Sequence, residues 1–194
     1  MLSSTVDGAR VPAMFVFGDS LLDPGNNNHL VTLAKADYAP NGIDFAGGVT
    51  GRFCNGGTVA DHLGTLLGLP LIPPFNNPNT TGSRILQGVN FASAASGILS
   101  DTGRLYNLYD LGGRRFLVAS LGPLGCIPNQ IGNSGGSSDS CVSQTNHLAA
   151  QFNTKLRTML DELNGSLQGS YFLYWDAYAS ATEIIDNYAD YGTN

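Results

Sequence analysis

A chain of 194 residues, of which 42% are hydrophobic and only 12% charged, is large and apolar enough to bury a core, which excludes an intrinsically disordered protein. The formal net charge of −6 leaves no basic patch that could neutralise phosphates and argues against nucleic acid as a partner. No run of about 18 apolar residues occurs, so the sequence predicts no transmembrane segment.

The chain begins with a polar stretch and then a buried strand. Residues 1–12 are interpreted as an N-terminal tail, and they contain no apolar stretch typical of a signal peptide. The short apolar run over 13–18, "AMFVFG", ends in glycine and predicts a strand. Residues 29–36, "HLVTLAKA", predict a short helix.

A better-marked helix is predicted over residues 58–70. Thr58 is a suitable N-cap, Asp61 stands three residues later in capping-box spacing, and Gly68 provides a stop. Further along, residues 88–98 predict a strand that turns into a loop of small residues.

The second half of the chain alternates strands with helices. Residues 114–128 predict a strand that runs into a Gly/Pro loop, and residues 170–178 predict another strand. An amphipathic pattern predicts a long helix over 142–164, and a last helix follows the second of these strands. Leu148 is expected on the core-facing side of the long helix. This alternation is typical of an α/β fold with a parallel sheet covered on both faces, here as one domain over 13–194.

Two kinds of side chain bear on the compartment of the protein. Cys126 and Cys141 flank a Gly/Ser loop and could form a disulfide that leaves Cys54 over, but three reduced thiols fit the sequence equally well. Asn79 and Asn164 each begin an Asn-x-Ser/Thr triplet, which is a glycan acceptor only in a secreted chain. No His/Cys cluster has the spacing of metal ligands, so neither a metal nor a cofactor is predicted.

The stretch "AMFVFGDSLLDPGNNN" over 13–28 holds the candidate nucleophile. A serine in a turn directly after a strand exposes its hydroxyl next to backbone N–H groups, and Ser20 has this position. The flanking Asp19 and Asp23 could be mistaken for a catalytic carboxylate pair, but hydrogen bonds within the turn and loop are their favoured role. Asp176, which follows the last predicted strand, is likewise interpreted as structural.

Five ordered segments resemble the plant GDSL-type lipase/esterase family of the SGNH hydrolase superfamily. They are "FVFGDSLLDPGNNN", "GRFCNGGTVADHLGTLLGLPLIPPF", "GVNFASAASGIL", "LGGRRFLVASLGPLGCIP" and "FNTKL…YFLYWDAY". The resemblance implies a flavodoxin-like α/β/α sandwich with a parallel sheet. It also implies hydrolysis of small-molecule or lipid carboxylic esters through an acyl-enzyme, and secretion from the cell.

Carried over residue by residue, the resemblance makes Ser20 both the nucleophile and a donor to the oxyanion through its N–H. Gly97 is the candidate for the second backbone donor. The family often has more glycines in that loop, where this chain has Ala94 and Ala95, so the register is defined only to within a residue or two.

The sequence departs from the family pattern at three functional pieces. The 194 residues contain no G-x-N-D motif, which supplies an oxyanion asparagine in the family, and no Asp-x-x-His block, which supplies the general base. They also contain no secretion signal. These absences predict an incomplete domain. His29, His62 and His147 are interpreted as exposed or packing residues rather than substitute bases. The alternative to a hydrolase is therefore a catalytically inactive remnant, or a protein that binds an acyl chain or a partner. The ester substrate and the oligomeric state are left open.

Overall fold

The structure is a computed structural model that describes residues 9–97, 109, 112–133 and 140–192. The chain divides into two compact units, Met1–Arg104 and Leu105–Asn194, and each is described by itself. Most of the predicted tail and most of the Gly/Ser loop before Cys141 lie outside the described residues. That one domain spans 13–194 stays a prediction.

The apolar runs of the first unit form extended segments that pair side by side, but only through isolated bridges, so the regular strands predicted at 13–18 and 88–98 do not form within the described residues. Val16 forms a parallel bridge with Asn90, and Asn90 forms another with Pro74. The Val16 N–H donates to the Val89 carbonyl (3.0 Å), and the Phe91 N–H donates to the Val16 carbonyl (2.7 Å). The segments around residues 16 and 90 therefore run in parallel, with the residues that follow them close together.

The core of this unit lies between the paired segments and one helix, α1 (Val59–Leu66). Its buried cluster comprises Val16, Ala60, Leu69 and Ile72. The helix begins as predicted, because Thr58 and Asp61 form both bonds of a capping box. It ends before Gly68, whose φ of +74° lies in the left-handed region that favours glycine.

The prediction of a helix over 29–36 is wrong. The only helical turn there is a 3-10 turn, η1 (Asn26–His29), and bends follow it. The Thr32 hydroxyl accepts a hydrogen bond from the Ala34 N–H (3.1 Å), and the Asn27 side chain donates to the Ala34 carbonyl (2.8 Å). These local bonds compete with helical ones, and a stretch this short has little helical stability of its own to oppose them.

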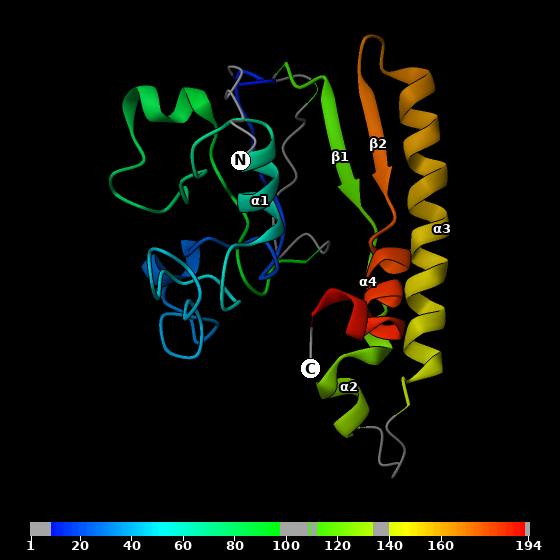
Figure 1. The fold of residues 1–194 in the computed structure, drawn as a ribbon. Coiled ribbons are helices and arrows are strands. Elements are labelled where there is room, and N and C mark those ends of the chain that lie inside the picture. Colours follow the sequence, from blue (N-terminus) through cyan, green and yellow to red (C-terminus); the bar gives the residue numbers. More distant parts are fainter. Residues whose placement is uncertain (1–8, 98–108, 110–111, 134–139, 193–194) are drawn as a thin grey trace, which may run out of the picture. The chain divides into compact units, whose positions relative to one another are not determined.

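The second unit confirms the α/β class and the parallel sheet. Strands β1 (Arg115–Ala119) and β2 (Tyr171–Trp175) pair in parallel over all five residues. The helix α3 (Ser143–Ser166) links them and lies against β2, as Figure 1 shows. A long helical connection of this kind is what a parallel pair requires.

Shorter elements complete the second unit. After β1 come a 3-10 turn, η3 (Leu124–Cys126), and α2 (Pro128–Asn133), and after β2 come α4 (Ala177–Asp186) and η4 (Tyr188–Tyr191). In the first unit, a further 3-10 turn, η2 (Gly82–Gln87), precedes the segment around residue 90. No helix in the described part of the chain combines the length and the apolar character needed to cross a bilayer.

The inward face of α3 differs from the expected one. Ala149, Asn153 and Leu160 are its buried residues, whereas Leu148 is 60% exposed, so the prediction that Leu148 faces the core is wrong. The Asn153 amide both donates to the Leu121 carbonyl (2.9 Å) and accepts from the Leu121 N–H (2.8 Å). The buried face of α3 thus includes a polar residue that bonds the loop after β1, a contact that hydrophobic spacing alone does not predict.

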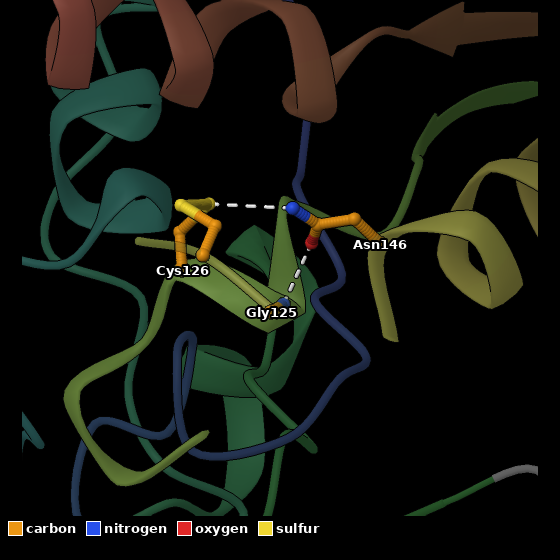
Figure 2. Close-up of a disulfide and its surroundings, with 4 residues drawn as sticks. Gly125, Cys126 and Asn146 are labelled. Atoms are coloured by element: carbon orange, nitrogen blue, oxygen red, sulfur yellow. Dashed lines mark hydrogen bonds between the residues drawn. A yellow bond between two sulfur atoms is a disulfide. The ribbon is translucent and has the colours of Figure 1, made fainter. Parts of the chain in front are cut away.

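A disulfide joins Cys126 to Cys141, which decides between the two alternatives for the cysteines (Figure 2). The Asn146 side chain on α3 holds the bridge in place, because its oxygen accepts from the Gly125 N–H (2.7 Å) and its nitrogen lies 3.4 Å from the Cys126 sulfur. The thiol of Cys54 is free and half-buried. The pairing ties the loop after β1 to the beginning of α3.

Candidate active site

Ser20 lies in a tight turn directly after the extended segment that contains Val16. The Leu22 N–H donates to the Asp19 carbonyl (3.2 Å), and the Leu21 N–H donates to the Asp19 carboxylate (3.0 Å). Ser20 is half-buried, and among the described residues neither its hydroxyl nor its N–H has a hydrogen-bond partner. Both groups are therefore available to a bound molecule.

Asp23 holds the loop after the turn in place from inside the protein. Its side chain is fully buried, and one carboxylate oxygen accepts from the N–H groups of Gly25 (2.8 Å) and Asn26 (2.6 Å). The other oxygen accepts from the Ala94 N–H (3.0 Å). Asp23 therefore connects the loop over residues 20–28, the serine loop, to the loop of small residues at Ala94, which lies 71 positions later in the sequence. The expectation that Asp23 forms hydrogen bonds with loop backbone is confirmed.

The asparagines that follow Asp23 bind the same distant loop. Asn26 and Asn27 are each 2% exposed. The Asn26 amide donates to the carbonyls of Asn90 and Ala92, both at 2.8 Å. The Asn27 amide donates to the Ala94 carbonyl (3.0 Å). Buried amides need such partners, and here they fix residues 20–28 against residues 90–94.

A buried ion pair also contacts the loop that follows Ser20. The Arg52 guanidinium forms a bidentate salt bridge with the Asp61 carboxylate, in which Nε donates to Oδ2 and Nη2 donates to Oδ1, both at 2.8 Å. A third nitrogen of Arg52 donates to the Pro24 carbonyl (3.3 Å). Burial acts to raise the pKa of Asp61, but hydrogen bonds from Arg52 and Thr58 outweigh it and hold that pKa below its ordinary value.

The loop that contains Gly97 begins with a turn over residues 93–96. The Ser96 N–H donates to the Ser93 carbonyl (3.1 Å), and the Ser93 N–H donates to the Gly18 carbonyl (3.0 Å), which brings this turn beside the serine turn. Ala95 has φ of +68°, the one positive value for a non-glycine residue in the described ranges. The expectation of glycine in this loop thus has a physical reason at position 95, because glycine adopts this backbone conformation without strain.

Ala95→Gly is expected to stabilise the protein by about 0.5 to 1 kcal/mol, because the left-handed region strains alanine by about 1–2 kcal/mol and the added chain entropy of glycine offsets part of that gain. The midpoint of urea unfolding measures the change. Ala94→Gly is the matched control, since Ala94 is buried and has no positive φ, and it is expected to destabilise the protein. A lower midpoint for Ala95→Gly would contradict the strain.

Among the described residues, no hydrogen bond joins any of the remaining candidates to another candidate of the site. His29, His62 and His147 are exposed. Asp176 caps α4 by accepting from the Ala179 N–H (3.0 Å), which confirms a structural role. No group of three or more metal-ligating side chains occurs within the described ranges.

Sequence reasoning missed two residues that shape this site, Arg52 and Asn90. Asn90 is 2% exposed and donates to the Leu22 carbonyl (2.8 Å), so it holds the far end of the serine turn. A signal for Asn90 was present, since an asparagine inside an apolar strand pattern must find buried partners. Arg52 had no comparable signal, because its Gly-rich surroundings are typical of an exposed loop.

Comparison with known proteins identifies the family. A model of the GDSL-like Lipase/Acylhydrolase family matches residues 100–193. The Arabidopsis thaliana protein GDSL esterase/lipase At4g16230 is 35% identical over an alignment that covers 95% of this chain and 73% of that protein. GDSL esterase/lipase At1g71691 is 36% identical (97% and 69%), and GDSL esterase/lipase 7 is 34% identical (93% and 72%), both from the same plant.

These alignments also bear on the expectation that the domain is incomplete. The match to At4g16230 spans 268 positions, which exceeds the 194 residues of this chain, so that relative has residues within the matched span that this chain lacks. The finding agrees with the expectation of an incomplete domain. With more than 30% identity over more than two thirds of each relative, the chain belongs to the GDSL esterase/lipase family.

Proposed function

We propose that this protein hydrolyses carboxylic esters and that Ser20 is its nucleophile. The observation that carries the proposal is the state of Ser20, half-buried in a turn after an extended segment, with its hydroxyl and N–H both unpartnered among the described residues. The names of the relatives, esterase/lipase, support the reaction class.

In the proposed reaction, the Ser20 oxygen attacks the carbonyl carbon of the ester, and the alcohol leaves from an acyl-enzyme that water then hydrolyses. The negative oxygen that forms needs aligned donors. The Ser20 N–H is one proposed donor and the Gly97 N–H the other. The hydrogen bond between Gly18 and Ser93 supports this pairing because it brings their two turns together.

Activation of Ser20 also needs a base, because a serine hydroxyl is a weak nucleophile at its ordinary pKa. The family's base is a histidine three residues after an aspartate, and none of His29, His62 and His147 has that aspartate. We therefore expect slow hydrolysis of activated esters, in which the leaving group needs no proton.

A second candidate is an acyl- or partner-binding protein without turnover. No G-x-N-D motif occurs in the 194 residues, which favours this candidate because a lost oxyanion donor lowers the rate by about a hundredfold or more. The two candidates share the fold and the loop network, and they differ only in whether Ser20 turns over an ester.

Ser20→Ala is expected to lower the hydrolysis of p-nitrophenyl acetate by purified protein to the buffer background. The removed oxygen is the only atom that could carry the acyl group in the proposed reaction. Ser83→Ala, which alters an exposed serine of η2, is the matched control and should keep the wild-type rate. Equal rates for the wild type and Ser20→Ala would favour the second candidate.

The proposed location is extracellular, as the family resemblance implies. The disulfide between Cys126 and Cys141 supports this, because such bridges persist in oxidising compartments and are rare in the cytosol. A small-molecule or lipid ester is the proposed substrate class.

A further inference from the structure

The two Asn-x-Ser/Thr triplets of the chain have different local structures. Asn79 lies in an exposed turn, which the Thr80 N–H closes by donating to the Asn77 carbonyl (2.8 Å). Thr80 is 7% exposed, and its hydroxyl donates to the Pro74 carbonyl (2.7 Å). The middle residue of this triplet therefore points inward and anchors the turn, while Asn79 and Thr81 on either side of it are exposed.

The side chain of Asn79 is also free to react. Its backbone N–H donates to the Asn77 side chain (2.9 Å), but its own amide has no hydrogen bond among the residues that the structure describes. Thr81 precedes η2 without a side-chain capping bond, so its hydroxyl is likewise unused. The two groups that define the acceptor are thus both exposed and uncommitted.

Asn164 is also exposed, but its side-chain amide is hydrogen-bonded to the fold. It lies near the end of α3, where its amide nitrogen donates to the Phe172 carbonyl (2.9 Å) and its oxygen accepts from the Phe172 N–H (2.7 Å). Phe172 belongs to β2, which pairs only with β1 within the described ranges. The Asn164 side chain thus forms, at the edge of β2 that does not face β1, the hydrogen bonds that a neighbouring strand would form. Both polar groups of its amide are used in these bonds.

We propose that Asn79 is an N-glycosylation site of this protein and that Asn164 stays unmodified. The proposal rests on the extracellular location proposed above. The donor is an oligosaccharide carried on a lipid diphosphate. The Asn79 Nδ2 attacks C1 of the first sugar, the bond between C1 and the phosphate oxygen breaks with its electron pair on the leaving lipid diphosphate, and Nδ2 loses one proton.

The geometry favours Asn79 because a glycan is bulky and needs open solvent. At Asn79 the glycan replaces a hydrogen that bonds nothing in the described structure, so the folded turn accepts it unchanged. At Asn164 the glycan would attach to the amide nitrogen that donates to the Phe172 carbonyl, and it would compete with this hydrogen bond at the edge of β2.

The test is to secrete the chain from a eukaryotic host behind a cleavable leader, which separates the site question from the natural location and from esterase activity. Release of glycans by peptide N-glycosidase in heavy-oxygen water converts a modified asparagine to labelled aspartate. Mass spectrometry of the wild-type protein is expected to find the label at position 79 and unlabelled asparagine at 164. This measurement needs no variant to fold.

Variants provide the matched controls. Asn79→Gln and Thr81→Ala should each abolish the mobility shift that the glycosidase causes, whereas Thr81→Ser, which keeps the hydroxyl, should retain it. Asn164→Gln should leave the shift unchanged. A label at Asn164, or none at Asn79, would overturn the proposal.

Discussion

Replacing Asp23 with alanine is expected to destabilise the first unit by about 3 kcal/mol or more. The carboxylate is fully buried and accepts from the N–H groups of Gly25, Asn26 and Ala94. Alanine would leave these three donors without acceptors, and an unsatisfied buried donor costs about 1–3 kcal/mol. The loss should appear as a lower midpoint of urea unfolding.

Two variants separate the loop contacts from a general effect of removing an aspartate. Asp23→Asn keeps the shape of the side chain but turns one acceptor into a donor, so we expect an intermediate loss. Asp19→Ala removes an exposed carboxylate that accepts from only one N–H, that of Leu21, and should cost less than 1 kcal/mol. If Asp23→Ala were no worse than Asp19→Ala, the proposed link between the two loops would be wrong.

The second large effect is expected at the ion pair of Arg52 and Asp61. Asp61→Ala leaves the guanidinium, whose side chain is 6% exposed, without its counter-charge, and it also removes the capping box of α1. Breaking a buried pair from one side typically costs about 3–5 kcal/mol. Chemical unfolding at neutral pH should show a loss of this size.

The same pair gives the protein a defined acid sensitivity. The pKa of Asp61 is lowered in the folded protein from the ordinary 3.8, so folding favours the charged form. Its contribution is fully present above the unfolded-state pKa and is lost as the pH falls through the lower folded-state pKa. We expect unfolding free energy to decline below about pH 4 and to decline less steeply in Asp61→Asn.

Asp176→Asn provides the control for the acid measurement. Asp176 also contacts an arginine, Arg157, but at 3.4 Å and with both side chains about half exposed. Solvent screens such a pair, so its removal should change the pH dependence little. Parallel curves for the wild type and Asp61→Asn between pH 5 and pH 3 would refute the role of Asp61.

Elements with strong local signals could be predicted from the sequence. The capping residues of α1 lie three positions apart, and the turn around Ser20 follows from the short-range bonds that aspartate forms. The helix expected over 29–36 failed because Asn27 binds the Ala34 carbonyl instead, which no helical periodicity reveals.

The long-range part of the site could not be predicted. Asn26 is 64 positions from Asn90, and Asp23 is 71 positions from Ala94, yet these contacts decide where the serine turn lies. Polar contacts between distant segments leave no periodic pattern in the sequence. The sequence could indicate that buried asparagines need hydrogen-bond partners, but it could not predict which residues those partners are.

Covalent labelling by a fluorophosphonate tests most directly whether Ser20 is a reactive nucleophile. The reagent phosphonylates a nucleophilic serine hydroxyl with loss of fluoride, a leaving group that needs no proton, and peptide mass spectrometry identifies the modified residue. We predict a single, slowly formed adduct on Ser20 that heat denaturation prevents and that the Ala95→Gly variant retains. A folded protein that gains no adduct, or gains it on another serine, would contradict the assignment.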